Sequence, residues 1–243
     1  MRRTGKEREE IGDMGVLLDA LKKSAVEIDR DRTTSFGESF EKQRRDFGKG
    51  YQVQNELVSV SKQGIKALKS GDATEVERCK QKMFRLWDDI GNINVPLDTW
   101  WQFSGNAGQE FVEFLGVASL WPYVTGVAQE MGSIPSVDEL RMRPQTWLRG
   151  LGDVPGELGK MVLAGLLEMD FSNKEERIAI RRRLVEVVQE IYGFLSLYET
   201  AYPQVINDSR MRGYRNTFRG MLQNVGFLLE KMKNELLGAM ERN

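Results

Sequence analysis

The chain has 243 residues, with 36 acidic and 35 basic side chains that nearly cancel, one cysteine and no histidine. This length is enough for one full core, and we expect a single domain over residues 1–243 with a flexible or loosely packed stretch at 1–12. The average charge gives no reason to expect a nucleic-acid or membrane partner, so any such surface must be a local patch. The absence of histidine excludes Ser–His and Cys–His nucleophile pairs and His-ligated zinc. Any catalysis must then use carboxylates, lysines, hydroxyls or an oxygen-ligated metal.

The single cysteine and the start of the chain suggest a location. Cys79 rules out an intrachain disulfide, fits a reduced intracellular setting, and is expected to be buried or inert. The first residues are charged and lack the apolar core of a signal peptide, and the longest uncharged run, 114–129, is broken by Pro122 and Gly126. We therefore expect no membrane partner and a cytoplasmic protein, or a nuclear one if the source is eukaryotic.

The hydrophobic pattern predicts an all-α fold. Long stretches follow the helical period, alternating β-branched runs are few, and there are only six prolines. The first three helices are expected over 14–29, 40–68 and 74–90, with a break at 70–72 between the second and the third. The apolar residues of the third helix that we expect to face inward are Val76, Cys79, Met83, Phe84 and Leu86.

Proline and glycine interrupt the middle of the chain. A helix follows Pro96, and a region punctuated by both residue types follows over 121–135. Ser136 and Glu139 then match a capping box, in which Ser136 caps the amide three residues on and Glu139 reaches back. This pattern predicts a short helix after Ser136.

Three further helices complete an expected set of about seven. The segment 145–169 is apolar and helical but rich in glycine, which is typical of closely packed helices because each glycine costs about 1 kcal/mol relative to alanine. Two long amphipathic helices follow over 175–198 and 209–240. With no internal repeat and no domain linker, the sequence predicts a single multi-helix bundle.

The segment GQEFVEFLG, 108–116, sets two glutamates in an apolar run. On a helix Glu110 and Glu113 share a face, and like charges at this spacing repel. In an apolar setting such a pair requires a proton, a basic partner or a bound cation. The alternative is a solvated stripe with the aromatic residues packed inward, and the motif alone favours that alternative.

A second acidic pair lies in GLGDVPGELGKM, 150–161, where Asp153 and Glu157 again share one helical face. Helical bundles build metal sites from carboxylates of facing helices, and hard oxygen ligands suit Mg²⁺ or Mn²⁺. Because no histidine is available, an oxygen-ligated metal is the chemistry that the four acids favour.

These two motifs resemble the translin family. GQEFVEFLG resembles the GLQEYVEA segment of translin-associated factor X, and TWLRGLGDVPGELGKM, 146–161, is similar to its DYLLGVADLTGELMRM segment. The similarity extends from Lys80 to the C-terminus and more loosely over the earlier helices. It implies a translin-like all-α bundle in a closed shell, mostly octameric, formed as a homo-oligomer or with a translin-like subunit.

The resemblance also implies a function and a site. The glutamates of the family's QEYVE motif match Glu110 and Glu113, and the acids of its DLTGE motif match Asp153 and Glu157, as in the cutting subunits of the family. This implies a magnesium-dependent endoribonuclease, with Mn²⁺ as a substitute, that binds and cleaves single-stranded RNA, DNA being an alternative ligand. Glu110, Glu113 and Asp153 are expected to bind the metal. Glu157 is either a further ligand or orients the attacking water.

Two positions depart from the family pattern. Pro155 stands where the family has threonine; it lacks an amide donor and clashes with the carbonyl four residues back, so a helix should kink or begin near it. Lys160 stands where the family has arginine, and it keeps the charge without bidentate phosphate recognition. Lys160 is either a contact to the scissile phosphate or an ordinary surface lysine.

Basic and aromatic residues also cluster near the C-terminus. Arg212, Arg215 and Arg219 share one helical face, with Tyr214 and Phe218 interleaved. Such a face can bind phosphates and stack bases, and it equally fits a solvated basic face over core aromatics. The three arginines are therefore candidate nucleic-acid contacts.

Three hypotheses follow for the activity. The first is the metal-dependent endoribonuclease, the second is a non-catalytic oligomer that binds single-stranded RNA or DNA and uses the acids structurally, and the third is a helical scaffold with neither activity. The first requires Glu110, Glu113 and Asp153 to converge on one metal ion, and Pro155 is where that convergence could fail.

Overall fold

A computed structural model describes residues 37–93, 97–168, 173–201 and 212–241. All regular elements in these ranges are α-helices, which confirms the predicted all-α fold. The expected N-terminal stretch 1–12 and the helix over 14–29 lie outside the described residues. The helices are α2 (Gly37–Ser70), α3 (Ala73–Gly91), α4 (Leu97–Thr125), α5 (Pro144–Glu168), α6 (Lys174–Ala201) and α8 (Arg212–Glu241).

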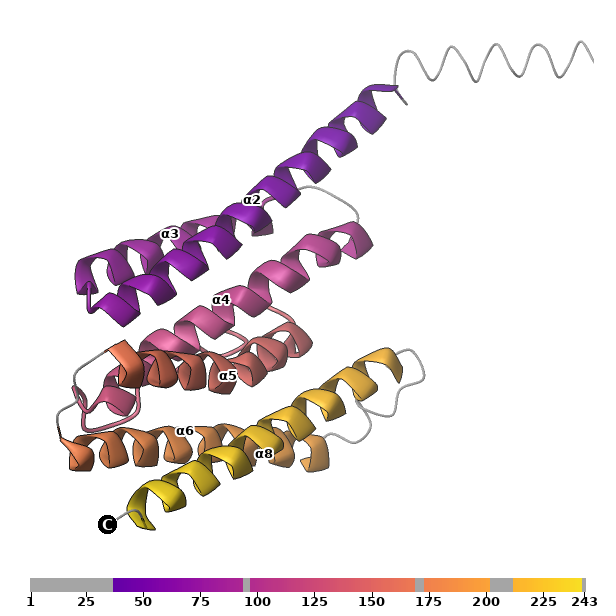
Figure 1. Cartoon of the computed structure of the whole chain (residues 1–243). Coiled ribbons are helices and arrows are strands. Elements are labelled where there is room, and N and C mark those ends of the chain that lie inside the picture. Colours follow the sequence, from indigo (N-terminus) through magenta and orange to yellow (C-terminus); the bar gives the residue numbers. More distant parts are fainter. Residues whose placement is uncertain (1–36, 94–96, 169–172, 202–211, 242–243) are drawn as a thin grey trace, which may run out of the picture.

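The turn between α2 and α3 follows from two adjacent residues. Gly71 has a φ of 72°, a left-handed conformation that glycine adopts without strain and that ends α2. The side chain of Asp72 then accepts a hydrogen bond from the amide of Glu75 at 2.9 Å and caps the start of α3. The predicted break at 70–72 is confirmed, and it places α2 and α3 side by side (Figure 1).

The predicted capping box forms its hydrogen bonds but does not start a helix. The amide of Glu139 donates to Ser136 Oγ at 3.3 Å, and the amide of Ser136 donates to Glu139 Oε2 at 2.7 Å. Residues 137–141 nevertheless form a turn, so the short helix expected there is wrong. The physical reason is the backbone of Arg141, whose φ of 49° is incompatible with a continuing helix; Pro144 then opens α5 and disfavours helical backbone at residue 143.

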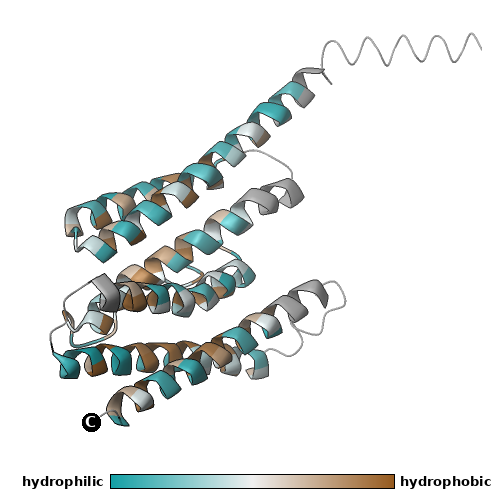
Figure 2. Ribbon diagram, viewed as in Figure 1, coloured by the Kyte–Doolittle hydropathy of each residue, from teal (hydrophilic) through white to brown (hydrophobic). Residues whose placement is uncertain are grey.

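The described helices stack in the order α3 and α2, then α4, then α5, then α6 and α8 (Figure 1). Teal and brown segments alternate along α2 and α8, as expected for helices with one buried and one exposed face (Figure 2). Among the described helices, none combines the length and apolar character that crossing a membrane requires. The middle position of α4 and α5 is what brings the two acidic segments next to each other.

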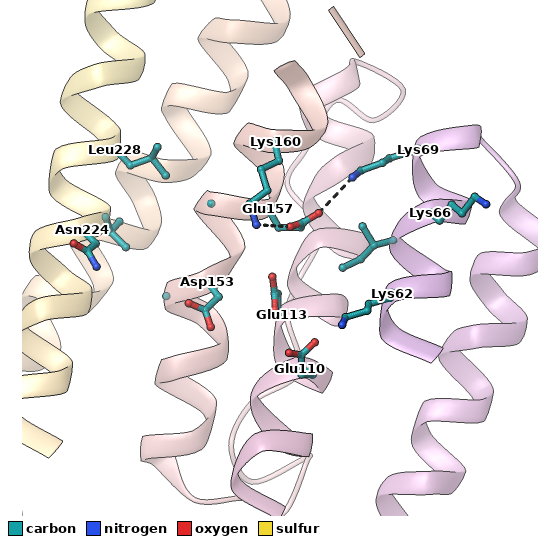
Figure 3. A pocket seen from close by; sticks show the side chains of 14 residues that line it. Lys62, Lys66, Lys69, Glu110, Glu113, Asp153, Glu157, Lys160, Asn224 and Leu228 are labelled. Carbon is teal, nitrogen blue, oxygen red and sulfur yellow. Dashed lines mark hydrogen bonds and ion pairs between the residues drawn. The ribbon is translucent and has the colours of Figure 1, made fainter. Parts of the chain in front are cut away.

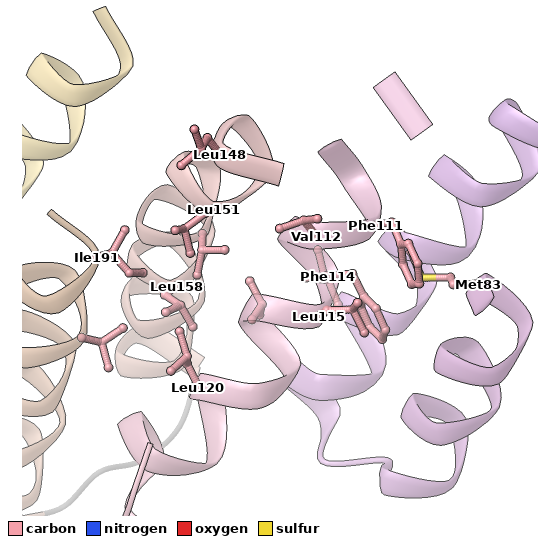
Figure 4. Packing of buried hydrophobic residues seen from close by; sticks show 14 of the residues in the cluster. Met83, Phe111, Val112, Phe114, Leu115, Leu120, Leu148, Leu151, Leu158 and Ile191 are labelled. Atoms are coloured by element: carbon pink, nitrogen blue, oxygen red, sulfur yellow. The ribbon is translucent and has the colours of Figure 1, made fainter. Parts of the chain in front are cut away.

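One connected cluster of buried side chains draws on all six described helices. At its edge the partly buried ring of Phe84 meets the buried ring of Phe111 edge to face, with centroids 5.0 Å apart. Figure 4 shows Met83 of α3 against Phe111 of α4. Of the residues expected to face inward from α3, Cys79, Met83 and Leu86 are buried, and the other two pack against the cluster.

Glycine allows close approach on both sides of α4. A Cβ at Gly64 of α2 would lie 2.4 Å from the ring of Phe114. A Cβ at Gly150 of α5 would lie 2.6 Å from the carbonyl oxygen of Gln109 and from Val112. These two glycines therefore set how closely α2 and α5 approach the acidic segment of α4.

Candidate functional site

A pocket of about 690 Å³ lies between α2, α4, α5 and α8, and all four predicted acids line it (Figure 3). Glu110 and Glu113 come from α4, and Asp153 and Glu157 come from α5. The other residues that line the pocket are Lys62, Ile65, Lys66, Lys69, Gly152, Gly156, Lys160, Asn224, Val225 and Leu228.

The packing of α4 turns its two glutamates toward this pocket. Phe111, Val112 and Phe114 are completely buried, so this segment of α4 is fixed by apolar packing around the two glutamates. Glu110 and Glu113 are half-buried rather than exposed. The solvated stripe that the motif alone favoured is therefore not the environment of these two residues.

Both acids of α5 face the same pocket, although Pro155 lies between them. The helix neither begins nor ends at Pro155; it runs from Pro144 to Glu168 through this residue. Figure 3 shows Asp153 and Glu157 directed into the pocket. Of the two outcomes expected at Pro155, a kink or a helix start, the helix start is wrong, and the proline does not separate the two carboxylates.

Glu113 has the most strongly perturbed carboxyl group of the pocket. Its pKa is raised to about 7, first because burial disfavours the charged form and then because Glu110, Asp153 and Glu157 lie near; Lys160 opposes the shift. A carboxyl group with this pKa exchanges its proton near neutral pH. At Glu113, burial and the three neighbouring acids therefore outweigh the attraction of Lys160.

The pKa of Glu110 is raised for similar reasons. Burial is the largest cause, Lys62 opposes it, and the carboxylates of Asp153 and Glu157 add to it. Residues from two other helices, α2 and α5, thus act on this one carboxyl group, which indicates that α2 is part of the site.

Asp153 is held by a neighbouring amide. Gln109 Nε2 donates to Asp153 Oδ2 at 2.5 Å, which joins the two acidic segments directly. Burial raises the pKa of Asp153, while this hydrogen bond and the charges of Arg149 and Lys160 lower it. No role was predicted for Gln109 from the sequence, although this residue directly precedes Glu110 in the motif.

Glu157 differs from the other acids because two lysines bind it. Lys160 Nζ lies 3.0 Å from Glu157 Oε2, and Lys69 Nζ of α2 lies 3.5 Å from Glu157 Oε1 (Figure 3). The pKa of Lys160 is raised, chiefly by its hydrogen bond to Glu157. Glu157 therefore links α5 to α2 through an ion pair.

The four acids share a pocket without forming a ready-made metal centre. In the described part of the chain, no three Asp, Glu or Cys side chains are placed so that they could hold one ion. The physical reason lies in their present partners, since Asp153 binds Gln109 and Glu157 binds two lysines. Glu110, Glu113 and Asp153 thus line one pocket, but they are not placed to hold one ion together.

A second, smaller recess of about 310 Å³ adjoins the carboxylates. Gln109 and Arg149 line it together with Gly220 and Met221. Gly152, Asp153 and Asn224 line both this recess and the larger pocket. Asp153 therefore lies where the two openings meet.

The predicted nucleic-acid contacts separate into two groups. Lys160 lines the carboxylate pocket. Arg219 does not line it and pairs with Glu199 of α6, with 3.0 Å between Nε and Oε1. The side chains of Arg212 and Arg215 lie outside the described residues, so their role stays a prediction.

Three lysines of α2 were missed in the sequence analysis. Lys62, Lys66 and Lys69 are exposed and line the pocket opposite α5. Their spacing of four and three residues places them on one helical face, which is a signal that the sequence contains. Which helix would face the acids, however, depends on the packing of α2 against α4.

Comparison with known proteins identifies the fold. No protein-family model and no curated protein matches the sequence. Among solved structures, apo-NeC3PO has a TM-score of 0.62 at 17% identity, over 84% of this chain and 95% of that chain. AfC3PO in a duplex RNA complex has a TM-score of 0.62 at 19% identity, over 86% of this chain and 96% of that chain. The structure of AfC3PO has a TM-score of 0.61 at 20% identity, over 86% of this chain and 97% of that chain. The chain therefore has the helical fold of C3PO, the complex of translin and translin-associated factor X.

Proposed function

We propose that the protein is a metal-dependent endoribonuclease that binds and cleaves single-stranded RNA within a translin-like oligomeric shell. The observation that carries the proposal is the meeting of four carboxylates from two helices in one pocket, three of them with raised pKa values. Partly buried carboxylates that lie close together are stabilised by a bound cation. A surface pocket of this kind fits hydrolysis of a phosphodiester better than it fits a purely structural role.

The donor set suits Mg²⁺, with Mn²⁺ as a substitute, because the ligand atoms are carboxylate oxygens. We assign the ion to Glu110, Glu113 and Asp153, whose side chains would have to turn toward it from their present positions. When bound, the ion would supply an activated water and relieve charge on the phosphate.

The remaining residues position these groups. Gln109 orients Asp153 through its hydrogen bond, and Glu157 holds Lys69 and Lys160 near the carboxylates. We therefore assign Glu157 to positioning of the lysines rather than to the metal. Lys160, one turn beyond Glu157, would contact the scissile phosphate.

RNA as the ligand and the oligomeric shell draw support from two further observations. One structural neighbour, AfC3PO, was solved in a complex with duplex RNA. Large apolar side chains are exposed on α6 and α8: Leu197 is 70% exposed and Phe227 is 75% exposed. Such side chains fit contacts between subunits, as an octamer or another closed assembly would require.

A non-catalytic RNA-binding oligomer is the second candidate function. It is favoured by the lysine contacts of Glu157 and by the absence, within the described residues, of three acids already placed for one ion. In this alternative the carboxylates hold lysines in place, and no cleavage follows binding.

Incubation of the purified protein with end-labelled single-stranded RNA decides between the two. With magnesium we expect internal cleavage that a chelator abolishes, and a loss on the order of 100-fold in Glu113→Gln and in Asp153→Asn. Glu190→Gln is the matched control, because Glu190 is an exposed carboxylate of α6 that does not line the pocket. Cleavage that survives chelator or both pocket variants would refute the metal mechanism, and binding without cleavage would favour the second function.

A further inference from the structure

We propose that Lys62, Lys66 and Lys69 of α2 bind the phosphate backbone of the RNA and hold the strand against the carboxylates. We call these three residues the lysine wall. The inference rests on the proposed function, because it takes single-stranded RNA as the ligand, and it adds residues that lie outside both acidic motifs.

The geometry of the lysine wall is that of an extended anion contact. Residues at this spacing lie along one face of α2 over about 10 Å. Figure 3 shows Lys62 and Lys69 directed toward the carboxylates, with the ammonium group of Lys66 turned outward. Two charges that face the pocket and a third on the outer side of the same helix edge match a chain of phosphates better than a single small anion.

The charges of the lysine wall are only partly used within the protein. Lys69 pairs with Glu157 at 3.5 Å, whereas Lys62 and Lys66 form no ion pair with any residue that the structure describes. Lys62 acts on Glu110 at longer range, and Lys66 has an exposed side chain. If the lysines served only to neutralise the acids, Lys66 would not need to stand at the open edge.

The lysine wall resolves an electrostatic conflict in the proposed function. Four acids without compensation would repel a polyanion from the pocket that must receive it. Four lysines line the same pocket, namely the lysine wall and Lys160. Lysine binds phosphate as a point charge, so a flexible strand can be held without a fixed bidentate geometry.

The opposite side of the pocket suits the other parts of a nucleotide. There α8 contributes the amide of Asn224 and the apolar side chains of Val225 and Leu228. An amide and apolar atoms can contact a base and a sugar and offer no charge to a phosphate. The pocket is therefore asymmetric, with the phosphates on the side of α2 and the bases on the side of α8.

The test measures the salt dependence of RNA binding in chelator, so that no cleavage occurs. Fluorescence anisotropy of a labelled single-stranded RNA gives log Kobs against log salt for the full chain and two triple variants. The wall variant is Lys62→Gln, Lys66→Gln and Lys69→Gln. The control variant removes three exposed lysines outside the pocket: Lys49→Gln, Lys80→Gln and Lys231→Gln.

Each lost phosphate contact on a single strand lowers the steepness of this plot by about 0.7. We therefore expect the wall variant to flatten it by about 2, the control variant to leave it unchanged, and replacement of all three wall lysines by arginine to restore it. Equal slopes for the wall and control variants would overturn the proposal. Thermal unfolding of each variant by circular dichroism verifies that the fold is kept.

The outcome for the lysine wall is separable from that for the nuclease. If the wild-type protein cleaves RNA in magnesium while the wall variant binds with unchanged salt dependence, the lysine wall fails and the nuclease stands. If the wall variant shows the flatter salt dependence while no condition gives cleavage, the lysine wall stands as the contact of an RNA-binding oligomer. A wild-type protein that binds no RNA refutes both.

Discussion

The Glu113→Gln variant removes one charge from the carboxylate pocket and keeps the size of the side chain. In the folded protein burial, assisted by Glu110, Asp153 and Glu157 and opposed by Lys160, raises the pKa of Glu113 from 4.5 to about 7. A carboxyl group whose pKa is higher in the folded state than in the unfolded state destabilises the fold once it is ionised. This unfavourable contribution therefore grows as the pH rises from about 4.5 to about 7 and is complete above that range.

The magnitude follows from the size of the shift. Each pK unit corresponds to about 1.4 kcal/mol, so the shift amounts to about 3 kcal/mol before screening. Because Glu113 lines an open pocket, solvent reduces the expected penalty to on the order of 1 to 2 kcal/mol. In chelator, Glu113→Gln should raise the free energy of unfolding by this amount at about pH 8 and by much less at about pH 5.

Urea unfolding followed by circular dichroism measures the effect at both pH values and at one protein concentration, since assembly shifts apparent stability. Glu190→Gln serves again as the control and should show no such pH-dependent gain. If Glu113→Gln destabilises the protein equally at both pH values, the ionised carboxylate is stabilised where it lies. Burial would then not destabilise the charged form of Glu113.

Three further predictions follow from the structure. Gly150→Ala should destabilise the fold by about 1 to 3 kcal/mol in urea unfolding, because its Cβ would lie 2.6 Å from Gln109 and Val112. Gly156→Ala has open space around its Cβ and should raise the free energy of unfolding by up to about 1 kcal/mol. A change of the same sign in both variants would show that packing at Gly150 does not limit the approach of α5 to α4. Millimolar Mg²⁺ should raise the melting temperature at about pH 8 and less at about pH 5, where protons compete for the carboxylates; a pH-independent rise would indicate binding elsewhere. Cys79 should react with a thiol reagent far more slowly in the native protein than in urea, because it is 1% exposed and burial raises its pKa; rapid native labelling would contradict this.

The helices could be predicted closely because their signals are local. The pattern placed helices over 40–68 and 145–169, and the structure has Gly37–Ser70 and Pro144–Glu168. Apolar periodicity and break residues such as Gly71 act within one or two turns, so they can be read without knowledge of the neighbours. The segment after Ser136 was predicted wrongly as a helix, because its capping residues match a helix start, whereas the left-handed backbone of Arg141 that ends the turn has no signal in the sequence.

The acids of the candidate site could be selected from the sequence, but their environment could not. Pairing Glu110 and Glu113 with Asp153 required only spacing and a family resemblance, and the structure brings all three to one pocket. That Glu157 binds Lys69 depends on α2 packing beside α4, a contact between segments far apart in the chain. No local pattern carries such information, and this is why the lysines of α2 were missed.

The pocket takes its walls from nearly the full length of the chain: Lys62 comes from the first described helix and Leu228 from the last. During synthesis, the ribosome releases α2 long before α8 has been made. The carboxylates of α4 and α5 and the lysines of α2 can already meet at that stage, but the pocket lacks the side that α8 contributes. A nascent or C-terminally truncated chain without α8 would thus lack the complete pocket.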